Sequence, residues 1–331
     1  MKTTRCKIFT GLPCLLTGLF LFGAICSELQ AASSTYPNHA ITVVIPFLPG
    51  GMTDLNGRTV VEPLEKQLKQ PVVVLNKAGG GTTVGGNTVA MAKPDGYTLG
   101  FFPDMTAIPE AFSYFYEAPY SSKDLKPVCN ILSPLIAYMV KGDAPWNSMK
   151  ELIEFAQKNP GLKVGIHGRM SPSYTAMAVL NRVAKTGFVD VPLESDAKII
   201  PAVLGGHIAM GATGWPPSKA LYDAKKVKIL VLISPEKRVD FAPEIPTLTE
   251  MGYKLTCFAV YGLFAPKGTP DEVVKRIQDA VHKISGDPDF RAKANSMGSQ
   301  VIYQDSASFE KSLTQAIEAY RVFFKEEGMV K

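Results

Sequence analysis

The sequence predicts an α/β protein built from mainly parallel sheets that are flanked by helices. Short apolar runs with the composition of buried strands recur at residues 41–45, 71–76 and 97–102. Segments with helical spacing separate these runs, and glycine-rich turns follow the first two. This alternation predicts a doubly wound sheet, in which ligands bind at the carboxyl ends of the strands.

The first turn, Pro49-Gly50-Gly51, leads from the strand at 41–45 into a helix. Glycine accepts a positive φ and has no side chain to block a ligand. The unpaired amides and the positive dipole end of a helix start favour a carboxylate or a phosphate. Asp54 has two interpretations here, as a cap of the helix or as a ligand contact.

The second turn follows the strand at 71–76 and has glycines at positions 79, 80, 81, 85 and 86. It lacks the Gly-Lys-Ser/Thr of a Walker loop and the Gly-x-Gly-x-x-Gly spacing of a dinucleotide site. The two turns therefore predict an anion cradle without nucleotide chemistry. The loop 103–106, after the strand at 97–102, is expected at the same edge of the sheet.

An apolar run at 131–140 is predicted to cross into a second domain, where the alternation restarts. Capping boxes are expected to begin helices at Ser148–Glu151 and, after a return strand at 255–265, at Thr269–Glu272. Pro63 is expected to kink or split a helix at 59–69. The further elements expected are strands at 162–166, 189–193, 208–212 and 227–233 and helices at 174–184, 196–204 and 306–326.

The N-terminus predicts export. A basic region at 2–7, an apolar core at 12–25 and small residues at 29–32 suit a signal peptide over residues 1–32. A retained membrane anchor is the alternative, but the apolar run is short and contains Pro13. Lipid attachment at Cys26 is a second alternative, although a bulky Ile25 precedes it.

Composition limits the function. The chain has 331 residues, of which 20% are charged and 46% hydrophobic, as in an ordinary globular protein of two domains. A net charge of +5 from scattered Lys and Arg argues against nucleic-acid binding. Cys129 and Cys257 are expected to be small buried hydrophobic residues, with a disulfide as the alternative in an exported protein.

The sequence has no Gly-x-Ser-x-Gly elbow, no His-Glu-x-x-His and no cluster of Cys and His. We therefore expect a protein that is not an enzyme, with no catalytic residues, no metal and no cofactor. An exported hydrolase, whose Ser, His and Asp meet only in space, is the alternative. Trp215 has two interpretations, as a residue that stacks on a ligand or as one that closes the edge of its domain.

Six short motifs occur in the order expected of one family of exported proteins. They are Tyr36-Pro, Ile45-Pro-Phe-x-Pro-Gly-Gly-x-Thr-Asp54, Asn76-Lys-x-Gly-Gly-Gly, Pro94-Asp-Gly-Tyr-Thr-Leu99, Pro246-Thr-Leu-x-Glu-x-Gly252 and Gly262-Leu-x-Ala-Pro-x-Gly-Thr-Pro270. With them, the mature chain resembles the Bug/TctC substrate-binding proteins of tripartite tricarboxylate transporters.

The resemblance implies a periplasmic-binding-protein fold of type II-like, two-lobed form, with the ligand held between lobes that close about a hinge. It implies a first lobe of residues 36–136 and 258–331 and a second of 137–257, crossed near 137–141 and 255–259. It also implies a small carboxylate ligand and membrane permease subunits as partners. We expect the protein to be a monomer. A periplasmic sensor that presents the ligand to a membrane receptor is the alternative.

The resemblance carries over ligand-binding residues from both lobes. In the first lobe they are Phe47, Gly50, Gly51, Thr53, Asp54, Gly80, Gly81, Thr82, Asp104 and Thr106. In the second lobe they are His167, Arg169, Ser171, Tyr174, Ser195 and Asp196.

The second lobe departs from the family pattern. His167-Gly-Arg-Met-Ser171 stands where the family has a Gly-Ser-rich loop, and Glu194 and Asp196 stand where a basic residue and glycines are usual. These two carboxylates are expected to repel a ligand carboxylate. Arg169 is the expected side-chain anchor, because a guanidinium fork fits a carboxylate.

Overall fold

The computed structural model describes residues 36–193, 195–255 and 260–329. The signal peptide expected at residues 1–32 lies outside the described residues, as do Glu194 and Cys257. The chain divides into an N-terminal unit, Met1–Asn38, and a main unit, His39–Lys331, which is the one whose architecture follows. Within the described part, none of the helices has both the length and the apolar character that a membrane span requires.

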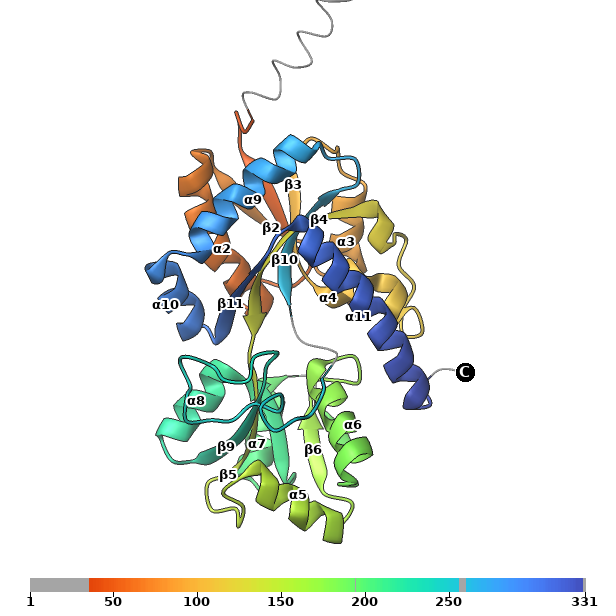
Figure 1. Ribbon diagram of the computed structural model, residues 1–331, viewed down its shortest axis with the longest axis vertical. Helices are drawn as coiled ribbons and strands as arrows, with labels where there is room; N and C mark the ends of the chain where they lie inside the picture. Colours follow the sequence, from red (N-terminus) through yellow and green to blue (C-terminus); the bar gives the residue numbers. More distant parts are fainter. Residues whose placement is uncertain (1–35, 194, 256–259, 330–331) are drawn as a thin grey trace, which may run out of the picture. The chain divides into compact units, whose positions relative to one another are not determined.

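The main unit contains two mixed sheets flanked by helices (Figure 1). The first sheet has the strand order β11-β4-β10-β3-β1-β2, and the second has the order β7-β6-β8-β5-β9. Strands of the first sheet are β1 (Ile41–Ile45), β2 (Val72–Asn76), β3 (Thr98–Pro103), β4 (Leu125–Pro134), β10 (Tyr261–Pro266) and β11 (Ser299–Gln304). Strands of the second are β5 (Ile136–Lys141), β6 (Lys163–Ile166), β7 (Val189–Pro192), β8 (Met210–Gly214) and β9 (Val227–Ile233).

The α/β class is confirmed, but the sheets are mixed where the sequence predicted mainly parallel pairing. β1 pairs in parallel with β2 and β3, and β6 pairs in parallel with β7 and β8. β4, β10 and β11 pair antiparallel in the first sheet, and so does β5 with both of its neighbours in the second. An enclosed strand has the same apolar composition in either direction, so the sequence did not reveal this.

The predicted crossing run is two strands, β4 and β5, which are separated only by Leu135 and carry the chain from the first sheet into the second (Figure 1). Both strands are almost completely buried. Near the crossing, the Leu135 N–H donates to the carbonyl oxygen of Gly298, and the Trp215 N–H donates to that of Leu135. Trp215 is 4% exposed and packs on Phe241, which fits its interpretation as a structural residue.

The helices agree with the predicted periodicity at several places. The longer helices are α2 (Met52–Leu68), α3 (Thr83–Ala90), α5 (Met149–Lys158), α6 (Pro172–Ala184), α7 (Asp196–Leu204), α8 (Trp215–Asp223), α9 (Asp271–Ser285), α10 (Pro288–Ser296) and α11 (Ser306–Glu326). Shorter helical turns are α4 (Asp104–Ala107), η1 (Gly80–Thr82), η2 (Pro109–Phe112) and η3 (Ser122–Asp124). Pro63 lies inside α2 without splitting it.

Neither of the two predicted capping boxes forms in full. At α5, the Glu151 N–H donates to the Ser148 hydroxyl, as expected, but the Glu151 carboxylate accepts the Asn147 N–H and not that of Ser148. At α9 the helix begins one residue later than predicted, with Pro270 as N-cap, and the Thr269 hydroxyl donates to the carbonyl of Pro266 instead. A Ser or Thr hydroxyl competes equally well for nearby carbonyls in a turn, which is why the motif misled.

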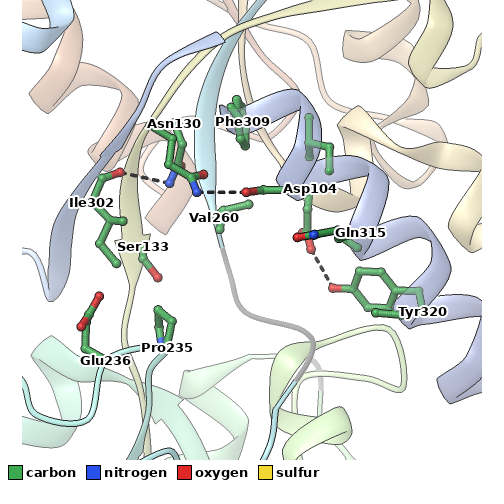
Figure 2. Close-up of a pocket in the computed structure, with 15 residues that line it drawn as sticks. Asp104, Asn130, Ser133, Pro235, Glu236, Val260, Ile302, Phe309, Gln315 and Tyr320 are labelled. Carbon is green, nitrogen blue, oxygen red and sulfur yellow. Dashed lines mark hydrogen bonds between the residues drawn. The ribbon is translucent and has the colours of Figure 1, made fainter. Parts of the chain in front are cut away.

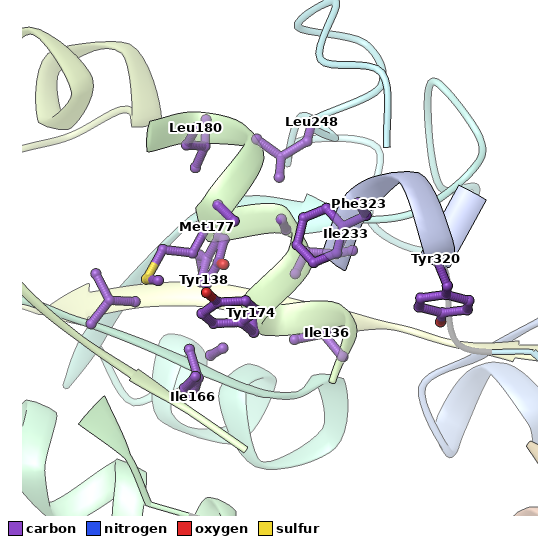
Figure 3. Close-up of a cluster of buried hydrophobic side chains, with 14 of the residues drawn as sticks. Ile136, Tyr138, Ile166, Tyr174, Met177, Leu180, Ile233, Leu248, Tyr320 and Phe323 are labelled. Atoms are coloured by element: carbon purple, nitrogen blue, oxygen red, sulfur yellow. The ribbon is translucent and has the colours of Figure 1, made fainter. Parts of the chain in front are cut away.

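A buried cluster joins α6 to the second sheet and to α11 (Figure 3). Tyr138 of β5 is completely buried, and its hydroxyl donates to the carbonyl of Ser173 at the start of α6. Tyr174 meets Phe323 of α11 edge to face, with ring centroids 6.2 Å apart. Burying an aromatic side chain of this kind stabilises the fold by roughly 1.5–3 kcal/mol. The last helix therefore connects the two sheets.

Gly86 of α3 provides a test of the packing beneath the predicted site. An added Cβ would lie 1.9 Å from the hydroxyl of Tyr120, which donates to the carbonyl of Thr106. We therefore expect Gly86→Ala to lower the free energy of unfolding by about 1–3 kcal/mol. Without the clash, the same substitution in a helix would stabilise by about 0.5–1 kcal/mol.

The control is a double-mutant cycle with Tyr120→Ala, measured by chemical denaturation. In that background the ring is gone, so Gly86→Ala should be neutral or stabilising. An equal loss of stability in both backgrounds would contradict this account of Gly86.

Candidate ligand-binding site

The first glycine turn is held by the side chain of Asp54, which is 2% exposed. Its carboxylate accepts the Gly50 N–H at 2.9 Å, the Arg58 Nε at 3.0 Å and the Asn76 Nδ2 at 2.9 Å. Burial alone would raise the pKa of Asp54, but these hydrogen bonds together lower it. Asp54 is the third residue of α2, so it organises the turn from inside the helix, and the N-cap position belongs to Gly51.

The turn presents main-chain donors at the carboxyl end of β1. Gly50 has a φ of +83°, which favours glycine. The first helical hydrogen bond of α2 runs from the Leu55 N–H to the Gly51 carbonyl, so the amides of Met52, Thr53 and Asp54 have no partner in the helix. Among the described residues, no acceptor bonds the Gly51 N–H either. This geometry suits an anion.

Side chains around the turn are fixed by neighbouring strands. The Thr53 hydroxyl donates to the Tyr261 hydroxyl of β10 at 3.1 Å. Asn76, the last residue of β2, also donates to the carbonyl oxygen of Phe47 at 3.0 Å. Thr53 is therefore buried inside the first sheet's packing, and Phe47 contributes its main chain to the support of the turn.

The second glycine turn has four consecutive residues with positive φ. The φ values are +132° at Gly79, +57° at Gly80, +61° at Gly81 and +87° at Thr82. Gly80 and Gly81 are exposed, and within the described part of the chain their N–H groups bond no acceptor. Successive unbonded amides in a turn of this kind are a form of backbone that can bind an anion.

Thr82 connects the second turn to the loop after β3. Its hydroxyl accepts a hydrogen bond from the Thr106 hydroxyl at 2.8 Å, and both residues are buried. Gly85, in the first turn of α3, has a packing role, because an added Cβ would lie 2.7 Å from Cβ of Pro46. The loops that follow β1, β2 and β3 thus meet at one edge of the sheet, as the sequence predicted.

Asp104, in the loop after β3, points to α11. Its carboxylate accepts the Tyr320 hydroxyl and the Met105 N–H, at 2.6 and 2.8 Å. Burial raises the pKa of Asp104 to about 6, against the effect of these two hydrogen bonds. The carboxylate also lines a cavity of about 480 Å³ beside α11, with Tyr320 (Figure 2).

The second sheet places a histidine and an aspartate together. His167, after β6, lies with its Nε2 2.7 Å from Oδ1 of Asp196, the first residue of α7. The Asp196 carboxylate also accepts the Gly214 N–H, at 3.2 and 3.3 Å to its two oxygens. The carboxylate expected to repel a ligand is therefore bonded on both sides by groups of its own lobe.

Arg169 pairs with Asp190 of β7. Its Nε and Nη2 donate to the two carboxylate oxygens at 2.9 and 3.3 Å, which raises the pKa of Arg169. The arginine side chain is 57% exposed. Only the arginine end of the pair is exposed, since the Asp190 side chain is 16% exposed. The guanidinium is therefore accessible to a second carboxylate beside Asp190.

The remaining predicted residues of the second lobe are helix starts. Ser171 is the N-cap of α6, where its hydroxyl donates to the Gly168 carbonyl and lies 3.4 Å from the Tyr174 N–H. Tyr174 is 8% exposed and belongs to the cluster with Phe323. Ser195 is the N-cap of α7 but makes no side-chain capping bond.

One close contact connects the first glycine turn with the His167–Asp196 pair. A Cβ added at Gly214 would lie 2.5 Å from Cε of Met52 and 3.2 Å from Oδ2 of Asp196. Met52, Gly214 and Asn76 were not among the predicted site residues. Asn76 could have been predicted, because a polar residue at the carboxyl end of a parallel strand lies at the ligand edge of the sheet.

These features define a two-lobed solute-binding protein, with bare amides at strand ends in one lobe and a polar cluster at strand ends in the other. The chain belongs to the family described as tripartite tricarboxylate transporter family receptor (TctC), whose model matches residues 57–329. Both the predicted family and the predicted two-lobed α/β fold are therefore confirmed. This is a family of periplasmic solute-binding receptors.

Similar proteins cover nearly the whole chain. A UPF0065 protein of Bordetella pertussis is 31% identical over 270 residues, which are 79% of this chain and 82% of that protein. A TctC solute-binding protein from Polaromonas, solved without ligand, has a TM-score of 0.76 at 26% identity and covers 88% of this chain and 100% of its own. MatC from Rhodopseudomonas palustris, solved with bound malate, has a TM-score of 0.68 at 26% identity and covers 87% of this chain and 99% of its own.

The raised pKa of Asp104 predicts a pH dependence of stability. The carboxyl titrates near 3.8 in the unfolded chain and about 6 in the folded one, so the folded state binds the proton more tightly between these values. The free energy of unfolding should therefore fall as the pH rises from about 4 to 6, by at most ~3 kcal/mol. Asp104→Asn has no such titration.

Urea denaturation of the parent and of Asp104→Asn at pH 4 and pH 7 measures this. We expect the variant to gain roughly 1–3 kcal/mol relative to the parent between the two pH values. The exposed Asp240→Asn controls for the loss of one negative charge. A difference between parent and variant that does not change with pH would refute the assignment.

Proposed function

We propose that this chain is a periplasmic receptor that captures a small carboxylate-bearing metabolite between its lobes and delivers it to the membrane permease of a tripartite transporter. In this proposal residues 1–32 are a cleaved signal peptide, and the mature protein is a monomer without a cofactor. The first lobe comprises residues 36–136 and 258–331, and the second 137–257. The membership of the two sheets supports these boundaries.

The observation that carries the proposal is the set of unbonded amides at the ends of β1 and β2. The first turn of α2, Gly51, Gly80 and Gly81 offer N–H donors that bond no acceptor among the described residues. Hydrogen bonds from such amides to a carboxylate are charge-assisted, and a few of them suffice for micromolar affinity, which needs about 8 kcal/mol. That MatC binds malate supports the same chemistry here.

The second lobe then recognises the remainder of the ligand. We assign this role to His167, Arg169, Ser171, Tyr174, Ser195 and Asp196. His167 and Asp196 already bond to each other; with the Nε2–H donating to Asp196, the His167 Nδ1 and the carboxylate offer acceptors to a ligand hydroxyl or amine. The contact of Met52 with Gly214 fits closure of the lobes over the ligand, by a hinge near 137–141 and 255–259.

A thermal-shift screen of mono-, di- and tricarboxylates, acidic amino acids and aromatic acids tests the function, with calorimetry on the best hit. A ligand that binds the folded state raises the melting temperature and is not consumed, whereas a hydrolase would turn it over. Uptake of that ligand by a deletion strain separates a transport receptor from a sensor. No shift with any acid would end the proposal.

Arg169 binds the ligand, in this proposal, by exchanging its bond to Asp190. Arg169→Ala should then weaken the best carboxylate by about tenfold, the value of one charge-assisted hydrogen bond. Asp190→Asn should strengthen the same ligand several-fold, because it releases the guanidinium. Calorimetry at fixed ionic strength measures both.

Arg238→Ala is the matched control, because this arginine is also part-exposed and paired with a carboxylate, that of Glu250, away from the proposed ligand residues. It should leave the affinity unchanged. An affinity that stays the same in both Arg169→Ala and Asp190→Asn would remove Arg169 from the site.

A further inference from the structure

The cavity beside α11 has features that the carboxylate site does not explain. Its volume of about 480 Å³ falls within the usual range for small-molecule sites, roughly 300–1,000 Å³. β4, β11, α11 and the loop at 235–236 supply its walls (Figure 2). Apolar side chains such as Ile302, Phe309 and Leu313 form much of the lining, with a small number of polar groups between them. That composition is typical of a ligand site.

Asn130 of β4 is the unusual group in this lining. The side chain is 2% exposed, and its Nδ2 donates to the Ile302 carbonyl oxygen at 3.0 Å. Its Oδ1 is buried and has no hydrogen-bond partner. A buried acceptor left unpaired destabilises a fold by about 1–3 kcal/mol, so a site that retains one calls for a donor.

The sheet is irregular around Asn130. The register of β4 shifts against β11 between Val301 and Gln304, and against β10 between Tyr261 and Gly262. Bulges of this kind re-aim side chains and are common beside functional sites. Here the shift frees the Ile302 carbonyl to accept the Asn130 amide, which fixes the orientation of the unpaired oxygen.

The charges of the cavity select the ligand. Asp104 and Glu236 contribute carboxylates, and among the described lining residues there is no Lys, Arg or His. Asp104 is mostly ionised at neutral pH, since its pKa is about 6. The rings of Phe309 and Tyr320 also line the space, and aromatic faces attract cations. A carboxylate would meet two like charges here, although Ser133, Ser312, Gln304 and Gln315 also bring donors to the lining.

We propose that this cavity is a second binding site, which takes a small organic ammonium compound whose N–H groups bond Asn130 Oδ1 and face the carboxylates of Asp104 and Glu236. An ammonium group supplies three donors and a positive charge, which match the unpaired Asn130 oxygen and the two carboxylates. The site is separate from the amides at the glycine turns and prefers the opposite charge.

Calorimetry of the full chain with three probes of matched length tests the charge preference: n-butylamine, 1-butanol and butyrate. At pH 8 the amine is protonated, since an alkyl ammonium has a pKa of about 10.4. We expect saturable binding of the amine and weaker or no binding of the alcohol. An alcohol that binds as tightly as the amine would overturn the charge assignment.

Two variants locate the amine. Asn130→Leu should weaken it by at least about tenfold, because a hydrogen bond to a charged donor is lost. Glu236→Gln, at an exposed position where misfolding is not expected, should weaken it about three- to tenfold. Glu244→Gln, in the same exposed stretch but outside the cavity lining, is the matched control and should have no effect.

The outcome is independent of the carboxylate proposal. Butyrate, or any hit from the acid screen, should bind equally to the parent and to Glu236→Gln. If one of the two sites does not bind its ligand, binding at the other site can therefore still be measured. No saturable binding of the amine by the parent would mean that Asn130 bonds only water, and would overturn the second site. Amine binding that Asn130→Leu and Glu236→Gln leave unchanged would overturn it equally.

Discussion

The buried carboxylate of Asp54 is the constraint on which the first lobe's ligand edge depends. This carboxylate accepts the Gly50 N–H, and it also accepts the side-chain amide of Asn76, which connects α2 to the end of β2. With that amide occupied, the backbone turns so that Gly51 and the first turn of α2 keep their N–H groups unbonded. One acid, paired with the turn, with α2 and with the end of β2, thus shapes a surface that can bind another acid.

The second lobe uses acidic side chains in the same way. Asp196 is bonded by His167 and by the Gly214 amide, and Asp190 by Arg169. A part-buried carboxylate is tolerated near an anion only when its own charge is compensated by donors. The departure of this chain from the family pattern at Asp196 is therefore consistent with a carboxylate ligand, because this carboxylate is bonded by its own neighbours.

Periodicity alone located α7, α11 and β9 with their bounds, because each has a strong apolar pattern. It missed β11, which is a half-exposed edge strand rich in polar residues, and α8, which begins with Trp-Pro-Pro. The expectation that ligands bind at the carboxyl ends of parallel strands also located the two glycine turns. The bonds of Asp54 to Asn76 and of Asp196 to Gly214 join residues 22 and 18 positions apart, and no local pattern encodes such pairs.

The most direct test of the central claim is a crystal structure with the tightest carboxylate from the ligand screen. The account predicts that carboxylate oxygens lie within hydrogen-bond distance of main-chain nitrogens at Gly51 or Met52 and at Gly80 or Gly81. A ligand whose carboxylate is held only by side chains, with those amides left in contact with solvent, would contradict it.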